Sequence, residues 1–117
     1  MTAPNILSIS TIIGKTAVQV VTTTATAIVS NSDASGKVFK VNALYVSNVD
    51  GEVNADISVD IFRSSTAYHI GKTIAVPADA TLDVVSKPVY LEEGDSIRLT
   101  ASANSDLEAV CSYEEIS

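Results

Sequence analysis

The chain has 117 residues, with seven basic and fourteen acidic side chains and a net charge of −7 at pH 7. This length suits one domain, and the scattered lysines and arginines argue against nucleic acid, which requires clustered positive charge. The single cysteine, Cys111, excludes an intrachain disulfide. No apolar run reaches the length of a membrane span, and residues 1–5 lack the pattern of a secretory signal.

The composition favours β-structure. Valine, isoleucine and threonine number 15, 11 and 11, so 37 of the 117 residues are β-branched. Such side chains lose rotamer freedom in helices and pack well on a pleated surface. We therefore expect an all-β fold: a single antiparallel β-sandwich, jelly-roll or immunoglobulin-like, with about eight short strands.

The N-terminal part divides the chain into two regions. Residues 1–13 form an N-terminal strand or arm, and residues 14–117 form the β-sandwich domain. The first region is an ordinary first strand or an arm that adds a strand to a neighbouring subunit, and both alternatives use the same sequence. The Thr/Ala/Val run at 16–30 is one long strand or two strands with a bend near Thr24. Residues 17–30 of it are a candidate contact face, because they are expected to be long, flat and nearly uncharged.

The middle of the chain predicts a hairpin. Residues 31–36 have loop composition, and residues 37–48 form a strand. Asp50-Gly51 then marks a tight turn, and residues 55–63 alternate apolar and polar side chains. The strands at 37–48 and 55–63 are therefore expected to pair with each other.

The second half predicts five further extended segments. Gly71 is a candidate bulge, and Pro88 places its segment at a sheet edge. The segments are 67–76, 80–86, 88–91, 96–102 and 107–116.

Two Gly-Lys-Thr triplets, at 14–16 and 71–73, do not make phosphate-binding loops. Such a loop needs a further glycine five residues before its second glycine, and a helix after it. The required positions hold Ile9 and Thr66, and the following residues form predicted strands. We expect a turn or bulge at each triplet.

Residues 50–56 place oxygen side chains at alternate positions, as a calcium loop does. The EF-hand pattern needs Gly at its sixth position and Glu at its twelfth, which here are Ala55 and Ile61. A polar turn is therefore the favoured interpretation. No metal site and no cofactor are predicted.

No catalytic constellation emerges, so the chain is not expected to be an enzyme. His69 is the only histidine, which favours a sheet-surface or interface role over a zinc ligand. Cys111 has no basic neighbour in sequence and lies among apolar positions, as a buried thiol does. The acidic groups at 92–95 and 114–115 are interpreted as solvated turns and edge protection.

Four segments, at 44–51, 55–61, 91–103 and 107–115, carry a resemblance. They resemble small virion structural proteins of marine and cyanobacterial tailed phages, over roughly residues 36–116. The resemblance implies a β-sandwich component of the particle, present in many copies. It brings no site residues with it, because no motif defines any.

Together these observations favour a capsid decoration (cement) protein, which binds the outer capsid surface and stabilises the head. Its partners would be the major capsid protein or other virion proteins, and it would form a homo-oligomer, with a trimer favoured. It would be made in the host cytoplasm and reside on the virion, without nucleic-acid or membrane partners. The candidate assembly contacts are Ile6, Leu7, Ile9, Ile12, Val18, Val20, Thr22 and Thr24.

Three alternatives stay open at this point. The first is a neck or tail component that forms a ring between head and tail. The second is a carbohydrate- or receptor-binding module, which needs an exposed aromatic patch from Tyr45, Tyr68, Tyr90 and Tyr113. The third is a small hydrolase, which needs a cleft around His69.

Overall fold

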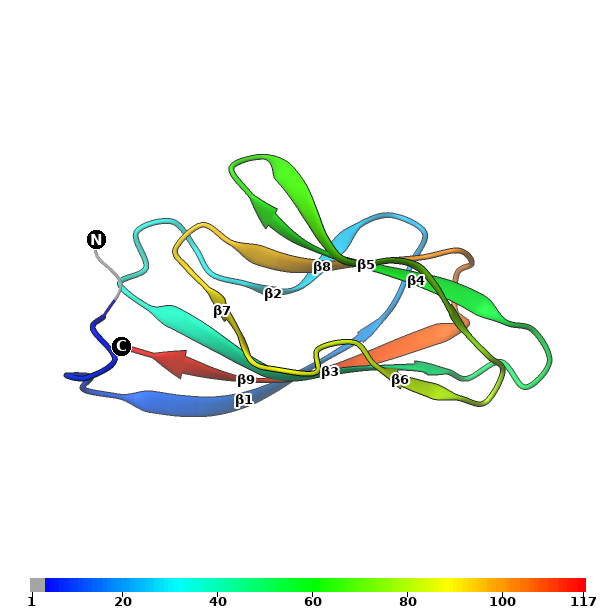
Figure 1. The fold of residues 1–117 in the computed structure, drawn as a ribbon, viewed down its shortest axis with the longest axis horizontal. Helices are drawn as coiled ribbons and strands as arrows, with labels where there is room; N and C mark the ends of the chain where they lie inside the picture. The colour runs from blue at the N-terminus through cyan, green and yellow to red at the C-terminus, as the bar shows by residue number, and fades with distance from the viewer. Residues whose placement is uncertain (1–3) are drawn as a thin grey trace.

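Two facing antiparallel sheets make up the protein (Figure 1). The computed structural model describes residues 4–117, which contain nine strands and no helix. The strands are β1 (Ile12–Val20), β2 (Thr26–Ser30), β3 (Val38–Asn48), β4 (Ala55–Arg63), β5 (Thr66–Val76), β6 (Thr81–Asp83), β7 (Val89–Leu91), β8 (Ser96–Ala101) and β9 (Leu107–Ile116). The predicted all-β sandwich is confirmed.

Strands that are neighbours in a sheet are mostly not consecutive in the chain. The first sheet runs β1-β9-β3-β6, with β7 also paired to β3, and the second runs β2-β8-β4-β5. In this part of the chain no helix is long and apolar enough to cross a membrane.

Alternating side chains build the core between the sheets. From the second sheet, Ile57, Ile97 and Leu99 are fully buried, and from the first sheet Leu44 and Leu107 are fully buried. The alternation predicted at 55–63, 96–102 and 107–116 is therefore the pattern that fills the interior.

The predicted hairpin between 37–48 and 55–63 is wrong. β3 belongs to the first sheet, whereas β4 pairs with β5 and β8 in the second. The tight turn follows β4 instead: Ser64 and Ser65 have φ values of 51° and 61°, and two such residues form the type I′ turn of a two-residue hairpin.

Asn48 explains why the chain changes sheets after β3. Its side chain is buried and donates to the carbonyls of Val53 and Val76, each at 2.9 Å. The first of these lies in the segment leaving β3, and the second ends β5 in the opposite sheet. One amide therefore fixes the crossing from one sheet to the other.

The Thr/Ala/Val run at 16–30 forms two strands in different sheets, so it makes no single flat face. The crossing residue Val21 is fully buried and donates to the carbonyl of Leu107, while the carbonyl of Thr22 accepts from Ala101. The predicted segments at 80–86 and 88–91 shrink to the three-residue strands β6 and β7. Following Pro88, β7 has only β3 as a paired neighbour among the described residues.

A polar network joins three loops around Asp95. This carboxylate is almost fully buried and accepts from Arg63 Nε at 2.7 Å and from the backbone N–H of Glu92 at 2.8 Å. Asn31 donates its backbone N–H to the Asp95 carbonyl and its side-chain amide to the carbonyls of Lys37 and Leu91. The network ties the β2–β3 loop, the β7–β8 turn and the end of the β4–β5 hairpin together.

The charge state of Asp95 reflects two opposing effects. Burial disfavours its carboxylate form, but the hydrogen bonds from Arg63 and Glu92 outweigh burial and hold the pKa of Asp95 below its ordinary value.

Substituting Asp95→Asn is expected to lower the free energy of unfolding by about 1–3 kcal/mol, because it leaves buried donors poorly paired. Glu92→Gln is the matched control, since Glu92 contacts the same guanidinium but is 66% exposed. It is expected to cost at most about 1 kcal/mol. Urea unfolding of both variants measures the difference, and equal losses would contradict the structural role of Asp95.

Candidate assembly interface

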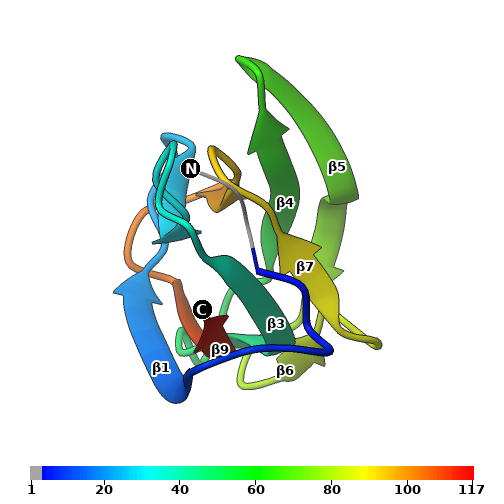
Figure 2. The same cartoon turned by 90° about the vertical axis from the view of Figure 1, so that its left-hand side faces the viewer.

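Strand β1 is an open edge of the first sheet (Figures 1 and 2). Within residues 4–117 its only paired neighbour is β9, over an unbroken register from Ile12↔Ile116 to Val20↔Glu108. The strand has nine residues, no proline and no register shift. Its opposite side is therefore available to another strand.

Hydrogen bonds at both ends of β1 establish which backbone groups face outward. Thr11 exchanges bonds with Ser117, at 2.8 and 2.9 Å, and Val21 donates to Leu107 at 2.9 Å. In an antiparallel ladder, the backbone N–H and C=O groups of alternate residues point to the same neighbouring strand. The backbone groups of the odd-numbered residues of β1 therefore point to β9. The N–H and C=O groups that point away from β9 belong to Ile12, Gly14, Thr16, Val18 and Val20.

The other sheet edges are short or irregular. β2 has five residues and a register shift between Ala27 and Val29. β5 has two register shifts against β4, and Thr73 within it has a φ of 52°. β6 and β7 have three residues each. Bulges and short strands are common protections against edge-to-edge pairing, so β1 stands apart as the long and regular edge of the sandwich.

An apolar strip runs from this edge across the outer face of the first sheet. Val18 and Val20 are 74% and 52% exposed. Val18 lies opposite Val110, which in turn lies opposite Tyr45, and both of these are also exposed. A hollow of about 390 Å³ lies at the edge, lined by β1 residues 18–20 and β9 residues 108–110. Val110 and Tyr45 are therefore candidate assembly contacts that were not among those predicted from the sequence.

Gln19 adds an unsatisfied group to the same place. Its side-chain nitrogen donates to the Ala27 carbonyl at 3.0 Å and so links β1 to the second sheet. Its Oε1 is the buried side-chain oxygen that has no hydrogen-bond partner in the described part of the chain. Buried polar side-chain atoms usually have a hydrogen-bond partner in the protein or in ordered water.

Glu115 fixes the beginning of β1. It accepts from Lys15 at 2.8 Å and from Lys37 at 3.2 Å, and its side chain is only 11% exposed. These bonds outweigh burial and lower the pKa of Glu115, and the same contact raises the pKa of Lys15. The one charged side chain of β1 is thereby held on the inner face, away from the outward-facing residues.

Residues 4–11 precede β1 and lie across the end of the sandwich (Figure 2). A turn at Asn5, whose side chain accepts from the Leu7 N–H, exposes Leu7 at 92% and Ile6 at 53%. Ile9 is half-buried. The backbone of Ser10 donates to Ser117, which anchors the segment to the C-terminus.

The eight expected assembly contacts therefore separate into three groups. Ile12, Val18 and Val20 share the β1 edge. Ile6, Leu7 and Ile9 belong to the preceding segment. Thr22 and Thr24 are exposed in the crossing between β1 and β2, at the other end of the strand.

His69 and Cys111 do not form a reactive centre. His69 is exposed on β5 opposite Asp60, whose carboxylate binds Arg98 at 2.9 Å. Cys111 is fully buried, and burial raises the pKa of its thiol to about 11, which disfavours the thiolate.

The carboxylates singled out in the sequence are held by structural hydrogen bonds. Glu93 accepts from the Gly36 N–H, and Glu114 accepts from Asn42. In the calcium-like segment, Asp50 accepts from the N–H of Glu52, as in an ordinary turn. Residues 4–117 contain no group of three or more His, Cys, Asp or Glu side chains placed to hold a metal ion.

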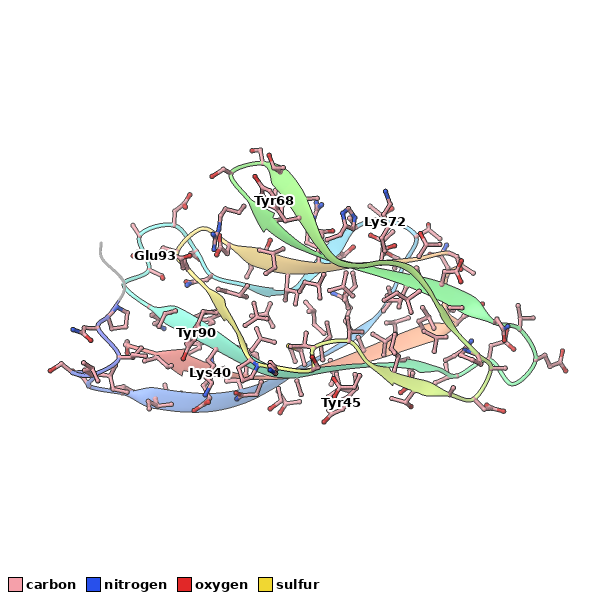
Figure 3. All side chains as sticks on the ribbon, in the orientation of Figure 1. Lys40, Tyr45, Tyr68, Lys72, Tyr90 and Glu93 are labelled. Atoms are coloured by element: carbon pink, nitrogen blue, oxygen red, sulfur yellow. The ribbon has the colours of Figure 1, made fainter. Side chains whose placement is uncertain are left out.

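Three of the four tyrosines, Tyr45, Tyr68 and Tyr90, are exposed (Figure 3), whereas Tyr113 is partly buried against the core. Tyr68 extends from β5 in the second sheet, whereas Tyr45 and Tyr90 belong to β3 and β7 in the first. Tyr113 packs against Phe39, with ring centroids 5.7 Å apart. They do not form the single exposed patch that a sugar-binding platform needs.

No family model and no curated protein matches this sequence. Among solved structures, the fold is similar to a chain from the endospore appendages of Bacillus, described as a novel family of disulfide-linked pili. The TM-score is 0.52 at 14% identity, over 90% of this chain and 87% of that chain. At this identity the likeness concerns the fold alone.

Stability is expected to fall as the pH drops below about 4. The pKa values of Glu115 and Asp95 are lowered in the folded state. Their contribution is present above the unfolded pKa and is lost as the pH falls through the folded pKa. Urea unfolding at about pH 7 and pH 3 measures this loss, and Glu115→Gln should reduce it whereas the exposed Glu108→Gln should not. Identical pH dependence in both variants would count against the Glu115 contacts.

Proposed function

We propose that this chain is a structural protein of a tailed-phage virion: a capsid decoration protein that binds the outer surface of the head and stabilises it. The observation that carries the proposal is the open β1 edge, with five residues whose backbone groups point away from β9 and an apolar strip beside them. Such an edge binds another protein by strand addition.

The chemistry of the surface supports assembly over catalysis or sugar binding. The acidic groups singled out in the sequence at 92–95 and 114–115 are bound by Arg63, Lys15, Lys37, Asn42 and a backbone N–H. The thiol is buried, and the exposed tyrosines lie on different strands. The domain would therefore bind partners through its sheet faces and sheet edges.

The fold likeness fits a subunit of an ordered assembly. The Bacillus protein belongs to pili described as disulfide-linked. Here the single cysteine is fully buried in β9, so it offers no exposed sulfur to a neighbour. Assembly of this chain would depend on backbone pairing and apolar contacts, with the major capsid protein or another virion protein as the partner.

Analysis of purified particles tests the location. The chain is expected in particles from an infected culture, and after heads and tails are separated it should remain with the heads. Quantitative mass spectrometry of the two fractions gives the ratio to the major capsid protein. Recovery with the tails would instead support a neck or tail ring, and absence from particles would overturn the proposal.

The N-terminal segment supplies a second test. The double variant Ile6→Ser/Leu7→Ser is expected to bind particles lacking the chain about tenfold more weakly, because two exposed apolar side chains lose their burial in the contact. Val49→Ser/Val53→Ser is the matched control, since these valines are 51% and 55% exposed between β3 and β4. They lie at the start of β9, whereas Ser10 and Thr11 bind the chain at its end. Co-sedimentation measures binding. Equal affinities would reject a role for the segment as an arm.

A further inference from the structure

We infer that the first partner of the β1 edge is a second copy of this chain, paired antiparallel through β1 around a two-fold axis beside Thr16. The two first sheets would then join into one continuous sheet across the dimer. This inference rests on the proposed function, because it names the unit that would be delivered to the particle surface.

Backbone geometry selects the register. The outward-facing residues are the even-numbered ones from Ile12 to Val20, and an antiparallel partner must present its own outward-facing residues opposite them. A two-fold axis at Thr16 pairs all five with their counterparts, and about ten hydrogen bonds form. Shifting this register by two residues would leave at least one outward-facing residue of each copy without a counterpart to hydrogen-bond.

Side-chain sizes are complementary in the same register. Val18, the most exposed valine of the strand, lies opposite Gly14 of the second copy, and Ile12 lies opposite Val20. A Cβ at Gly14 would meet nothing within 4 Å, and Gly14 has no positive φ, so the isolated chain gives no reason for a glycine there. A glycine inside a strand often marks the close approach of another backbone.

Charge does not oppose this pairing at the contact itself. None of the five outward-facing residues is charged, and Lys15 is held on the inner face by Glu115. Thr16 faces Thr16 of the second copy, a pair of side chains that can hydrogen-bond across strands. The nearest acidic side chains in these rows, Glu114 and Glu108, lie one strand away on β9, opposite Gly14 and Val20.

The other occupants fit the edge less well. Residues 4–11 leave β1 at its first residue and turn across the end of the sandwich toward β3, away from the open edge (Figure 2). A three-fold ring would need β1 to pair with a second long edge of the next copy. β2 and β5 carry register shifts, and β6 and β7 have three residues each.

The oligomeric state is the first test. Sedimentation equilibrium of the full chain over a concentration series is expected to give twice the 12.2 kDa of one chain. A monomer at all concentrations, or a trimer or larger ring, would overturn the two-fold pairing.

A charge exchange tests the register. In Gly14→Lys/Val18→Lys, like charges lie directly opposite each other twice across the axis, whereas Gly14→Glu/Val18→Lys places opposite charges there. Both positions are exposed, and circular dichroism with thermal melting checks that both variants fold. The Lys/Lys variant is expected to dissociate with a constant at least about tenfold higher than the Glu/Lys variant. Equal constants would contradict the register.

Disulfide trapping gives an independent readout of the axis. Two copies of Thr16→Cys would bring their Cα atoms to about 5.5 Å, within reach of a disulfide. Val18→Cys is the matched control, since its two copies would be offset by four residues, about 13 Å. Under mild oxidation with copper phenanthroline, which accepts the two electrons, Thr16→Cys is expected to form covalent dimers and Val18→Cys is not. Trapping of neither, or of both equally, would reject the axis.

These outcomes are separable from those of the proposed function. Particles that contain the chain, together with a monomer in solution, would reject the dimer and leave the virion proposal standing. A two-fold dimer that is absent from particles would do the reverse.

Discussion

Backbone hydrogen bonding at the sheet edges is the constraint on which this structure depends. A two-sheet sandwich satisfies the N–H and C=O groups of its inner strands but leaves an edge strand half paired. In this protein β9, β3, β8 and β4 are inner strands, and most of the edges around them are short or bulged. β1 is the exception, because it combines nine regular residues with an uncharged outward-facing side. Among the edges of the described residues, β1 is therefore the one with a long and regular row of outward-pointing backbone groups.

Polar side chains near the ends of the strands hold β1 and the loops in place. Glu115, with Lys15 and Lys37, holds the start of β1 against β9 and β3, and Gln19 links its far end to β2. Asp95 and Asn48 do similar work at the opposite sheet and at the crossing between sheets. Asp95 and Glu115 are buried and charge-assisted, and the Asn48 amide is buried and doubly bonded, so these three specify local geometry more strongly than apolar packing alone would. A sandwich with few aromatic residues gains definition from them.

The fold class could be predicted from the sequence because period-two alternation and β-branched composition report directly on burial. The alternation at 55–63 placed Ile57 and Val59 in the core without knowledge of pairing partners. Pairing itself was not predictable in the same way. The β4–β5 hairpin closes through Ser64 and Ser65 at positive φ, whereas the usual signal for such a turn is Asn-Gly or Asp-Gly, which the chain places at Asp50-Gly51. The role of Asn48, a polar residue buried by two long-range bonds, carries no local signal at all.

The candidate interface likewise depends on strand pairing, which the local sequence does not predict. Ile12, Val18 and Val20 were predicted from the sequence as assembly contacts, but their common place on one sheet edge follows only from the topology. Val110 and Tyr45 join them only through the cross-strand register. Gly14 is the informative residue, since glycine weakens a strand interior and nothing in its own chain fills the space above it. A long, regular edge with no charge among its five outward-facing residues favours aggregation when the domain is alone. The same edge suits a subunit in which another strand permanently covers it, because strand pairing then fixes both the direction and the register of the partner.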